Sequence, residues 1–229
     1  MLQFWISLLV FLASHSVISR TKLRPLLIRR LGEKNYFRFY SLLSMVLLGW
    51  VFAAALAAPR IPLWPWVHAY YWVPNITMPL ACIFFMSGFL RPNPLSIMAG
   101  SGRFNPARPP FMIAVTRHPV LWGFFLWAAS HILPNGEFPL AFLFTVFALF
   151  ALAGTWLVDR KRRRQLGAEQ WAQLAANTAN IPLTGKGLWR GRFTLNSHDL
   201  ATMGAGLGLY IVLYMLHPLL FNIMPAPPL

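Results

Sequence analysis

Residues 117–164 decide the fold of this protein; they read RHPVLWGFFLWAASHILPNGEFPLAFLFTVFALFALAGTWLVDRKRRR. Two apolar stretches without lysine or arginine, 119–133 and 138–158, lie on either side of Asn135-Gly136. Proline at a first helical position favours helix initiation, and an Asn-Gly pair favours a tight turn. A bilayer core needs about 20 apolar helical residues, with about 17 to 25 tolerated. The segment therefore predicts two membrane helices joined by a short turn.

The composition of the whole chain agrees with a membrane protein. Of 229 residues, 57% are hydrophobic and 11% are charged, and the mean hydropathy is +0.54. Ordinary soluble domains contain about 25% charged residues, so a soluble globular protein is excluded. Cys82 is the single cysteine, which excludes an internal disulfide and a multi-cysteine metal or iron–sulfur site. Any metal or cofactor site must then rely on histidine.

Six uncharged stretches are candidates for membrane spans. The third is expected to begin only at residue 76, because Pro62, Pro65 and Pro74 interrupt the uncharged run before it. The first is interpreted as a retained helix and not a signal peptide, since the first basic residue, Arg20, follows it. The spans are expected at about 1–18, 40–58, 76–90, 119–133, 138–158 and 201–220. This predicts an all-α membrane protein, a six-transmembrane-helix bundle.

Lysine and arginine alternate between the loops, and this pattern predicts the topology. The loops following the first, third and fifth spans hold seven, four and eight basic residues, whereas the other two loops together hold only Arg60. Basic residues gather in cytoplasmic loops. The odd-numbered loops are therefore predicted to be cytoplasmic and both termini to lie outside the cytoplasm.

The formal net charge of +15 would suggest nucleic acid in a soluble protein, but here the basic residues lie in short clusters between spans. A polybasic run just cytoplasmic of a span typically binds anionic lipid, so no nucleic-acid partner is expected. The run follows Asp159 and is expected to continue the fifth helix into the headgroup layer. Its members are Arg160, Lys161, Arg162, Arg163 and Arg164. In the sixth span, Gly204 and Gly208, with Ala205 and Gly206 alongside, predict close helix packing in the bundle or in a homodimer.

Histidines in or beside the spans are the candidate site residues, because ionisable groups are costly in lipid. His15 lies near the cytoplasmic end of the first span, and an interhelical hydrogen bond or ligation would explain it equally well. Arg117 and His118 precede the fourth span, and His131 lies near its other end. A helix rises about 1.5 Å per residue, which separates these two histidines by about 20 Å. Each would need a ligating partner from another span.

Several motifs together resemble one family of bacterial membrane proteins, the NnrU family. The resemblance covers about residues 1–185 as an NnrU-like membrane domain, and 186–229 adds a basic loop, the sixth span and a proline-rich tail. The motifs are His15-Ser16, Arg20, Leu31-Gly32, Tyr40-Ser41, Ser44, Asn93-Pro94, Arg117-His118-Pro119, Trp122-Gly123, Trp127, His131, Asn135-Gly136 and Leu166-Gly167 to Pro182.

The resemblance implies a multi-pass protein of the bacterial cytoplasmic (inner) membrane, tied to the expression or activity of nitrite and nitric oxide reductases in denitrification. A similar enzyme, 15-cis-zeta-carotene isomerase, carries haem b. Its histidine ligands would fall on His15 and His131, and its Arg-His-Pro on Arg117, His118 and Pro119. His118 is an alternative partner for His15, because both are expected near the cytoplasmic side. Ala128 stands where the isomerase resemblance would place a cysteine, so isomerase chemistry stays open.

Two other functional classes are compatible with the sequence. The sequence also resembles membrane methyltransferases that bind S-adenosylmethionine. The resemblance lies in Arg-His-Pro at a helix start and in the later segment from Leu166-Gly167 to Pro182, which is interpreted as a short amphipathic helix. Those enzymes offer an acidic pair before the Leu-Gly, whereas this chain offers Asp159 and then five bases. A non-enzymatic assembly factor for the reductases is the third class.

The charge pattern makes a topology prediction that reporter fusions can test. A fusion after Phe221 should be active outside the cytoplasm, and one near Lys186 inside it, because nineteen of the twenty basic residues lie in odd-numbered loops. The opposite pair of activities would contradict the six-span topology.

Overall fold

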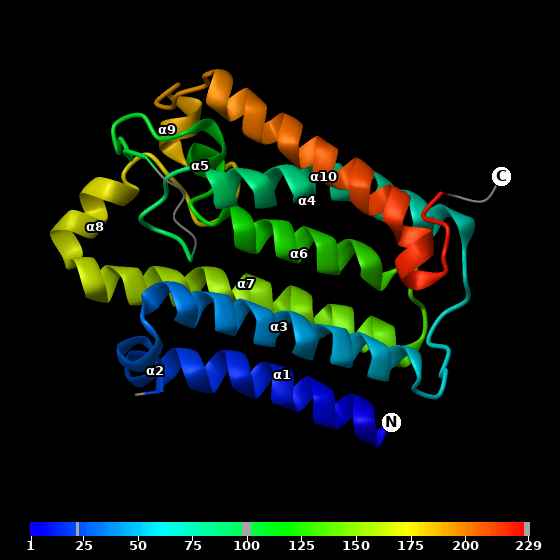
Figure 1. The fold of residues 1–229 in the computed structure, drawn as a ribbon. Coiled ribbons are helices and arrows are strands. Elements are labelled where there is room, and N and C mark those ends of the chain that lie inside the picture. The colour runs from blue at the N-terminus through cyan, green and yellow to red at the C-terminus, as the bar shows by residue number, and fades with distance from the viewer. Residues whose placement is uncertain (22, 98–101, 227–229) are drawn as a thin grey trace. The chain divides into compact units, whose positions relative to one another are not determined.

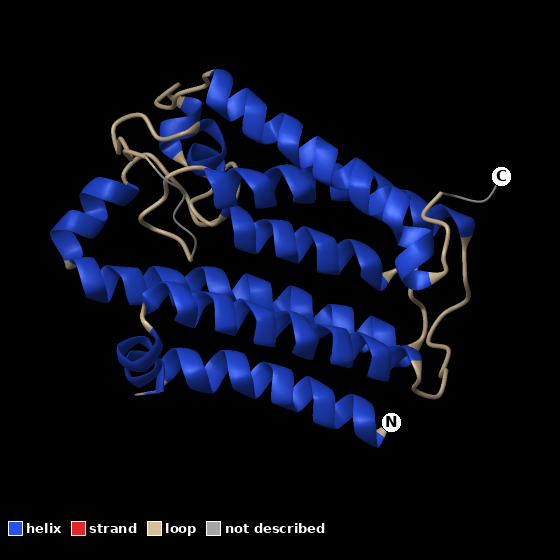
Figure 2. Ribbon diagram, in the orientation of Figure 1, coloured by secondary structure: helices blue, strands red, loops and turns tan. Residues whose placement is uncertain are grey.

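The computed structural model of the chain describes residues 1–21, 23–97 and 102–226, most of them in helices (Figures 1 and 2). Most of these helices carry long apolar runs. They are α1 (Leu2–Arg20), α2 (Leu23–Leu31), α3 (Glu33–Leu56), the 3-10 turn η1 (His68–Tyr71), α4 (Trp72–Leu90), α5 (Phe111–Val115), α6 (Pro119–Ile132), α7 (Phe138–Leu166), α8 (Ala168–Ala175), α9 (Lys186–Trp189) and α10 (Ser197–Phe221).

Each predicted span coincides with one of these helices. Four helical stretches among the described residues are long and apolar enough to cross a membrane: α3, η1 with α4, α7 and α10. The apolar helices of α1 and α6 are shorter. The prediction of an all-α protein with membrane-spanning helices is confirmed at this level. The count of six spans and the location of both termini outside the cytoplasm stay predictions.

Three helices begin earlier than the predicted spans: α3, which begins at Glu33 and not at residue 40, α4 and α10. α4 begins at Trp72 and not at residue 76, because Pro74 lies in the first turn, where backbone N–H groups have no partner within the helix and a proline removes nothing. α10 begins at Ser197 and not at 201, because Asn196 and Asp199 form a reciprocal capping box with bonds of 3.0 and 3.1 Å.

The chain divides into two compact units, Met1–Pro65 with Asn135–Leu143, and Trp66–Pro134 with Phe144–Leu229. In the first unit α1 packs on α3, and the aromatic ring of Phe4 meets that of Phe142 edge-on at 6.4 Å. The loop after α3 closes against the turn that precedes α7. Gly136 is required there for close approach, because an added Cβ would lie 2.9 Å from the Trp64 backbone oxygen.

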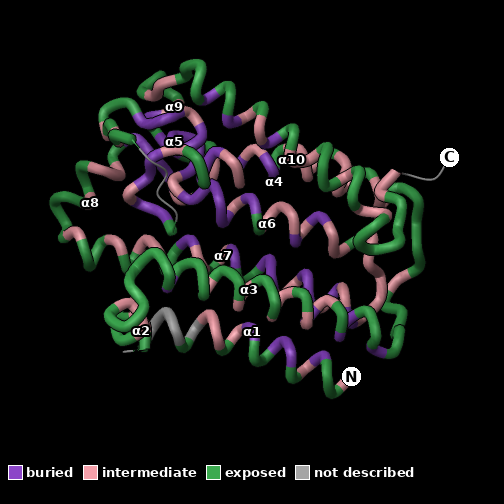
Figure 3. Tube along the Cα trace, in the orientation of Figure 1, coloured by how far each residue is buried: buried purple, intermediate pink, exposed green. Residues whose placement is uncertain are grey.

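The second unit packs α4 against both α6 and α10. Glycines on both sides bring α4 and α6 together. A Cβ at Gly88 would lie 2.8 Å from the Val120 backbone nitrogen, and a Cβ at Gly123 would lie 2.8 Å from the Ala81 carbonyl oxygen. The short helix α5 is buried beside them, as the purple segments of Figure 3 show. This tight packing positions the start of α6.

The close approach of α10 to α4 is made by Gly206 and not by the two glycines that the sequence analysis favoured. A Cβ at Gly206 would lie 2.5 Å from the Cα of Ile83, whereas among the described residues no atom lies within 4 Å of a Cβ added at Gly204 or Gly208. The helical period explains the difference, since residue 206 lies about 200° around the helix from 204 and 208. The expected close approach of this stretch to another helix is thus found at Gly206. Gly204 and Gly208 make no such approach among the described residues, and a homodimer through them stays a prediction.

The glycine geometry predicts different effects for two leucine substitutions in α10. Gly206→Leu should destabilise the protein by about 1 to 3 kcal/mol or more, because overpacking forces backbone shifts. Gly208→Leu, the matched control, should leave the melting temperature in detergent almost unchanged. Equal melting temperatures for the two variants would show that α10 does not pack on α4 in this register.

Candidate functional site

A partly buried polar cluster lies where the chain enters α6 and where the apolar part of α7 ends. Asp159 of α7 accepts hydrogen bonds from Arg117, with Nε to Oδ1 at 2.8 Å and Nη2 to Oδ2 at 2.7 Å. The Nε2 atom of His118 lies 2.6 Å from Asp159 Oδ1. The Nδ2 group of Asn180, in the loop after α8, donates to Oδ2 at 2.8 Å. One carboxylate therefore joins three segments that are distant in the sequence.

His118 is enclosed at the start of α6, with 0% of its side chain exposed. Its Nδ1 atom lies 3.2 Å from the Ser96 hydroxyl, so both ring nitrogens have partners. Burial lowers the pKa of His118 below its ordinary value, although the hydrogen bond and charge of Asp159 act in the opposite direction. In the neutral ring, Nε2–H donates to Asp159 and Nδ1 accepts from Ser96. His118 thus links Ser96, in the loop after α4, to Asp159 of α7.

Backbone hydrogen bonds hold Arg117 in place from two sides. Asn93, which is 1% exposed, donates from Nδ2 to the Arg117 carbonyl at 2.8 Å. The Arg117 amide donates to the Ala179 carbonyl at 2.7 Å. The Asn180 carbonyl accepts from Thr116 Oγ1 at 2.7 Å and from the Trp122 indole at 2.8 Å. The loop after α8 is thereby tied to the start of α6.

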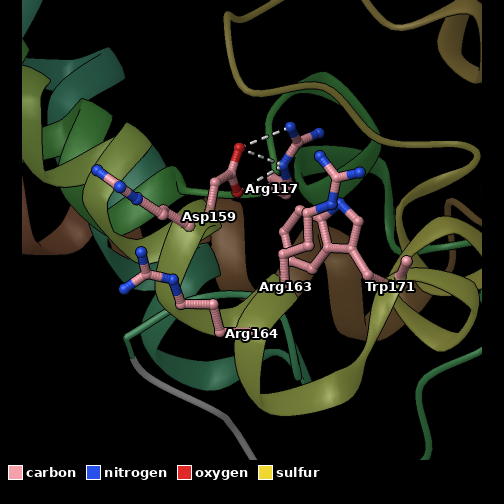
Figure 4. Close-up of a pocket in the computed structure, with 7 residues that line it drawn as sticks. Arg117, Asp159, Arg163, Arg164 and Trp171 are labelled. Atoms are coloured by element: carbon pink, nitrogen blue, oxygen red, sulfur yellow. Dashed lines mark hydrogen bonds and ion pairs between the residues drawn. The ribbon is translucent and has the colours of Figure 1, made fainter.

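A pocket opens beside this cluster, at the end of α7 and the start of α8. Its volume is about 530 Å³, within the range of roughly 300 to 1,000 Å³ typical of small-molecule sites. The guanidinium of Arg117 lies 5.5 Å from the ring centroid of Trp171, which forms one wall. Figure 4 shows Arg117 joined to Asp159, with further arginines nearby. The lining residues are Arg117, Asp159, Arg160, Arg163, Arg164, Ala168 and Trp171.

The two remaining candidate histidines lie in different units, His15 in α1 and His131 near the end of α6. Their local surroundings match. The Nδ1 atom of His15 lies 2.9 Å from the Phe11 carbonyl oxygen, and that of His131 lies 2.7 Å from the Trp127 carbonyl oxygen. In both cases the carbonyl belongs to the residue four positions earlier. A serine directly before each histidine also lies near Nδ1, at 3.2 and 3.3 Å.

The structure assembles Arg117 and His118 with residues that the sequence analysis did not select as site residues. The sequence analysis treats Asp159 only as the residue before the basic run and as the acid before Leu166-Gly167, and it gives Ser96 and Asn180 no role. One signal could have identified Asp159: it is one of only five acidic residues in the chain and directly follows an apolar span. No local pattern marks Ser96 or Asn180. Within residues 1–21, 23–97 and 102–226, no group of three or more His, Cys, Asp or Glu side chains could hold a metal ion.

Comparison with protein families identifies the chain. The model of the family described as NnrU protein matches residues 3–225, nearly the whole chain, and so includes the sixth predicted span. Comparisons with curated proteins and with solved structures found no match. The chain belongs to the NnrU family.

The polar cluster predicts that Asp159 is needed for stability. Asp159→Asn should lower the stability by about 3 to 5 kcal/mol, because it leaves the Arg117 guanidinium largely buried without a counter-charge. Arg160→Gln, the next residue along α7 and exposed, should have little effect on the melting temperature in detergent. A variant with asparagine at 159 that melts like the unmodified protein would contradict this role.

Proposed function

We propose that this NnrU-family protein binds haem b in the membrane through His15 and His131. The pairing follows from the resemblance to haem-carrying relatives. The observation that supports it here is that both imidazoles make the same hydrogen bond, from Nδ1 to the carbonyl four residues earlier. A backbone carbonyl can only accept, so Nδ1 of each ring must carry the proton, since it bonds to the Phe11 carbonyl in one case and to the Trp127 carbonyl in the other. In the neutral form of a ring bonded in this way, the lone pair lies on Nε2.

This arrangement fits the requirements of a ligating histidine. Such residues usually donate the second ring N–H to a carbonyl or carboxylate, which fixes the tautomer and the ring orientation and raises the basicity of the ligating nitrogen. Aromatic rings restrict both imidazoles further. The His15 ring centroid lies 4.3 Å from that of Phe11 and 5.6 Å from that of Tyr40, and the His131 ring centroid lies 5.2 Å from that of Phe144. Flat apolar walls of this kind suit a macrocycle.

His118 is the weaker candidate for ligation. Both of its nitrogens are already hydrogen-bonded, to Asp159 and to Ser96, and its side chain is fully buried. Ligation would break the 2.6 Å contact with Asp159, on which the Arg117 cluster depends. We therefore assign His118 and Arg117 a structural role at the start of α6, and we propose His15 and His131 as the haem ligands.

When bound, haem supplies an iron centre whose potential depends on its axial ligands and its surroundings. The chain's contribution is to orient two imidazoles and to surround them with apolar side chains. Within the family framework, we propose that this centre supports the expression or activity of nitrite and nitric oxide reductases in the bacterial inner membrane. A narrower version of this proposal is that the haem centre carries out an isomerase-like reaction.

The basic end of α7 complements this proposal by facing the headgroup layer. Arg160, Lys161, Arg163 and Arg164 are exposed in the last two turns of the helix, directly after its apolar part. Polybasic segments at such positions attract anionic lipid by about 1 kcal/mol per charge. We propose that this segment fixes the depth of α7 in the membrane.

An S-adenosylmethionine-dependent methyltransferase is the second candidate, and the polar cluster makes it weaker. Within residues 138–166 the one acid before Leu166-Gly167 is Asp159, and its two oxygens already accept from Arg117, His118 and Asn180. No second acid lies in this segment to receive the amine or ribose of the cofactor.

Three alanine variants test the haem proposal. The purified protein should show a low-spin haem absorption spectrum that changes on reduction with dithionite. His15→Ala and His131→Ala should each lose that spectrum, because each removes an axial ligand. His118→Ala should retain it when the protein remains folded.

His198→Ala, at an exposed position near the start of α10, is the control and should keep the full spectrum. Protein that purifies without colour from haem-replete cells and binds no added haemin would overturn the proposal. Protection from thermal unfolding by S-adenosylmethionine would then favour the methyltransferase.

A further inference from the structure

We propose that the pocket at the end of α7 is a binding site for the phosphate group of a small ligand that also carries an apolar or ring moiety. This inference concerns residues that the haem proposal does not use. It also differs from general attraction to an anionic membrane surface, because it requires a defined cavity with a side wall.

The charges lining the pocket are strongly unbalanced. Arg160, Arg163 and Arg164 are exposed in the pocket lining, and no carboxylate pairs with any of the three in the part of the chain that the structure describes. The one acidic residue of the lining, Asp159, is already committed to Arg117 and His118. The pocket therefore presents uncompensated positive charge, which favours an anion.

The spacing of these arginines favours phosphate over a single carboxylate. Residues at i, i+3 and i+4 lie on one side of a helix, so Arg160, Arg163 and Arg164 can present their guanidinium groups around one cavity. Each guanidinium is a planar fork that suits two oxygens. A carboxylate offers two oxygens and one charge, whereas a phosphate ester offers more oxygens and up to two charges. Several guanidinium groups around one cavity therefore favour a phosphate ester over a carboxylate.

Trp171 distinguishes this pocket from a flat basic surface. α8 turns back at Gly167, whose φ of 81° is in the region that favours glycine. The Trp171 amide donates to the Gly167 carbonyl at 3.1 Å, which places Trp171 on the first turn of α8. Its ring lies under the Arg117 guanidinium, 5.5 Å away. The pocket thus joins an apolar aromatic wall to a group of arginines, which indicates a ligand with both a phosphate and an apolar or ring moiety.

Two sources of such a ligand share this chemistry: the headgroup region of an anionic phospholipid and a soluble phosphate ester such as a nucleotide. The experiment uses full-length protein and one probe for each source. ATP is titrated by calorimetry into protein in neutral nanodiscs, and retained phosphatidylglycerol is measured by native mass spectrometry against phosphatidylcholine.

At least one of the two probes should bind, and its affinity should depend on the residues that line the pocket. Arg163→Gln with Arg164→Gln should weaken binding at least about tenfold, because each charge-assisted hydrogen bond is worth about a factor of ten or more. Arg190→Gln with Arg192→Gln removes the same charge from exposed positions outside the pocket lining and should change binding less than about twofold. Binding of ATP identifies the soluble source, and selective retention of phosphatidylglycerol identifies the lipid.

Trp171 provides the second test, because its substitution leaves the charge unchanged. Trp171→Ala should weaken binding several-fold and Trp171→Phe should restore most of it, with melting temperatures confirming that both variants are folded. Equal losses in the two arginine pairs, or no effect of Trp171→Ala, would show only diffuse attraction and would overturn the proposal. Absence of binding by both probes would also overturn it. His15→Ala should bind normally, which separates this result from failure of the haem proposal.

Discussion

The rest of the second unit depends on the hydrogen bonds that the Asp159 carboxylate accepts. This carboxylate accepts hydrogen bonds from Arg117, His118 and Asn180, which precede α6 or follow α8. A carboxylate in partly buried surroundings is costly unless it is paired and hydrogen-bonded. Because the chain has only five acidic residues against twenty basic ones, this single acid determines which segments meet at this end of α7.

The same interaction shapes the pocket beside it. Arg117 uses Nε and Nη2 to bind Asp159, and its guanidinium lies over Trp171, which fixes one wall. With the acid bound to Arg117 and His118, no carboxylate among the described residues pairs with Arg160, Arg163 or Arg164 in the pocket lining. The ion pair between Arg117 and Asp159 therefore ties the loops around α6 together and shapes the pocket that we propose binds an anion.

Three histidines show how surroundings separate residues of one type. His118 bonds to side chains through both nitrogens and contributes to a buried network. His15 and His131 instead bond through Nδ1 to the carbonyl of the preceding helical turn. The contacts of His118 give it a structural role, whereas ligation by His15 and His131 stays a proposal, although all three histidines are predicted near or within apolar spans.

The sequence by itself determined the helical membrane class, the positions of most helices and the importance of Arg117, His118 and Pro119, because apolar length, proline position and charge distribution are local properties. It also indicated the extension of α7 into its basic end. It could not determine the start of α4 at Trp72, since prolines that break a helix interior are tolerated in a first turn. Only the tertiary structure showed that Gly206 and not Gly208 contacts α4, and that Asp159 binds Arg117 and not its basic neighbours in sequence. Both depend on which face of one helix meets another, and that orientation is set by packing between segments distant in the chain.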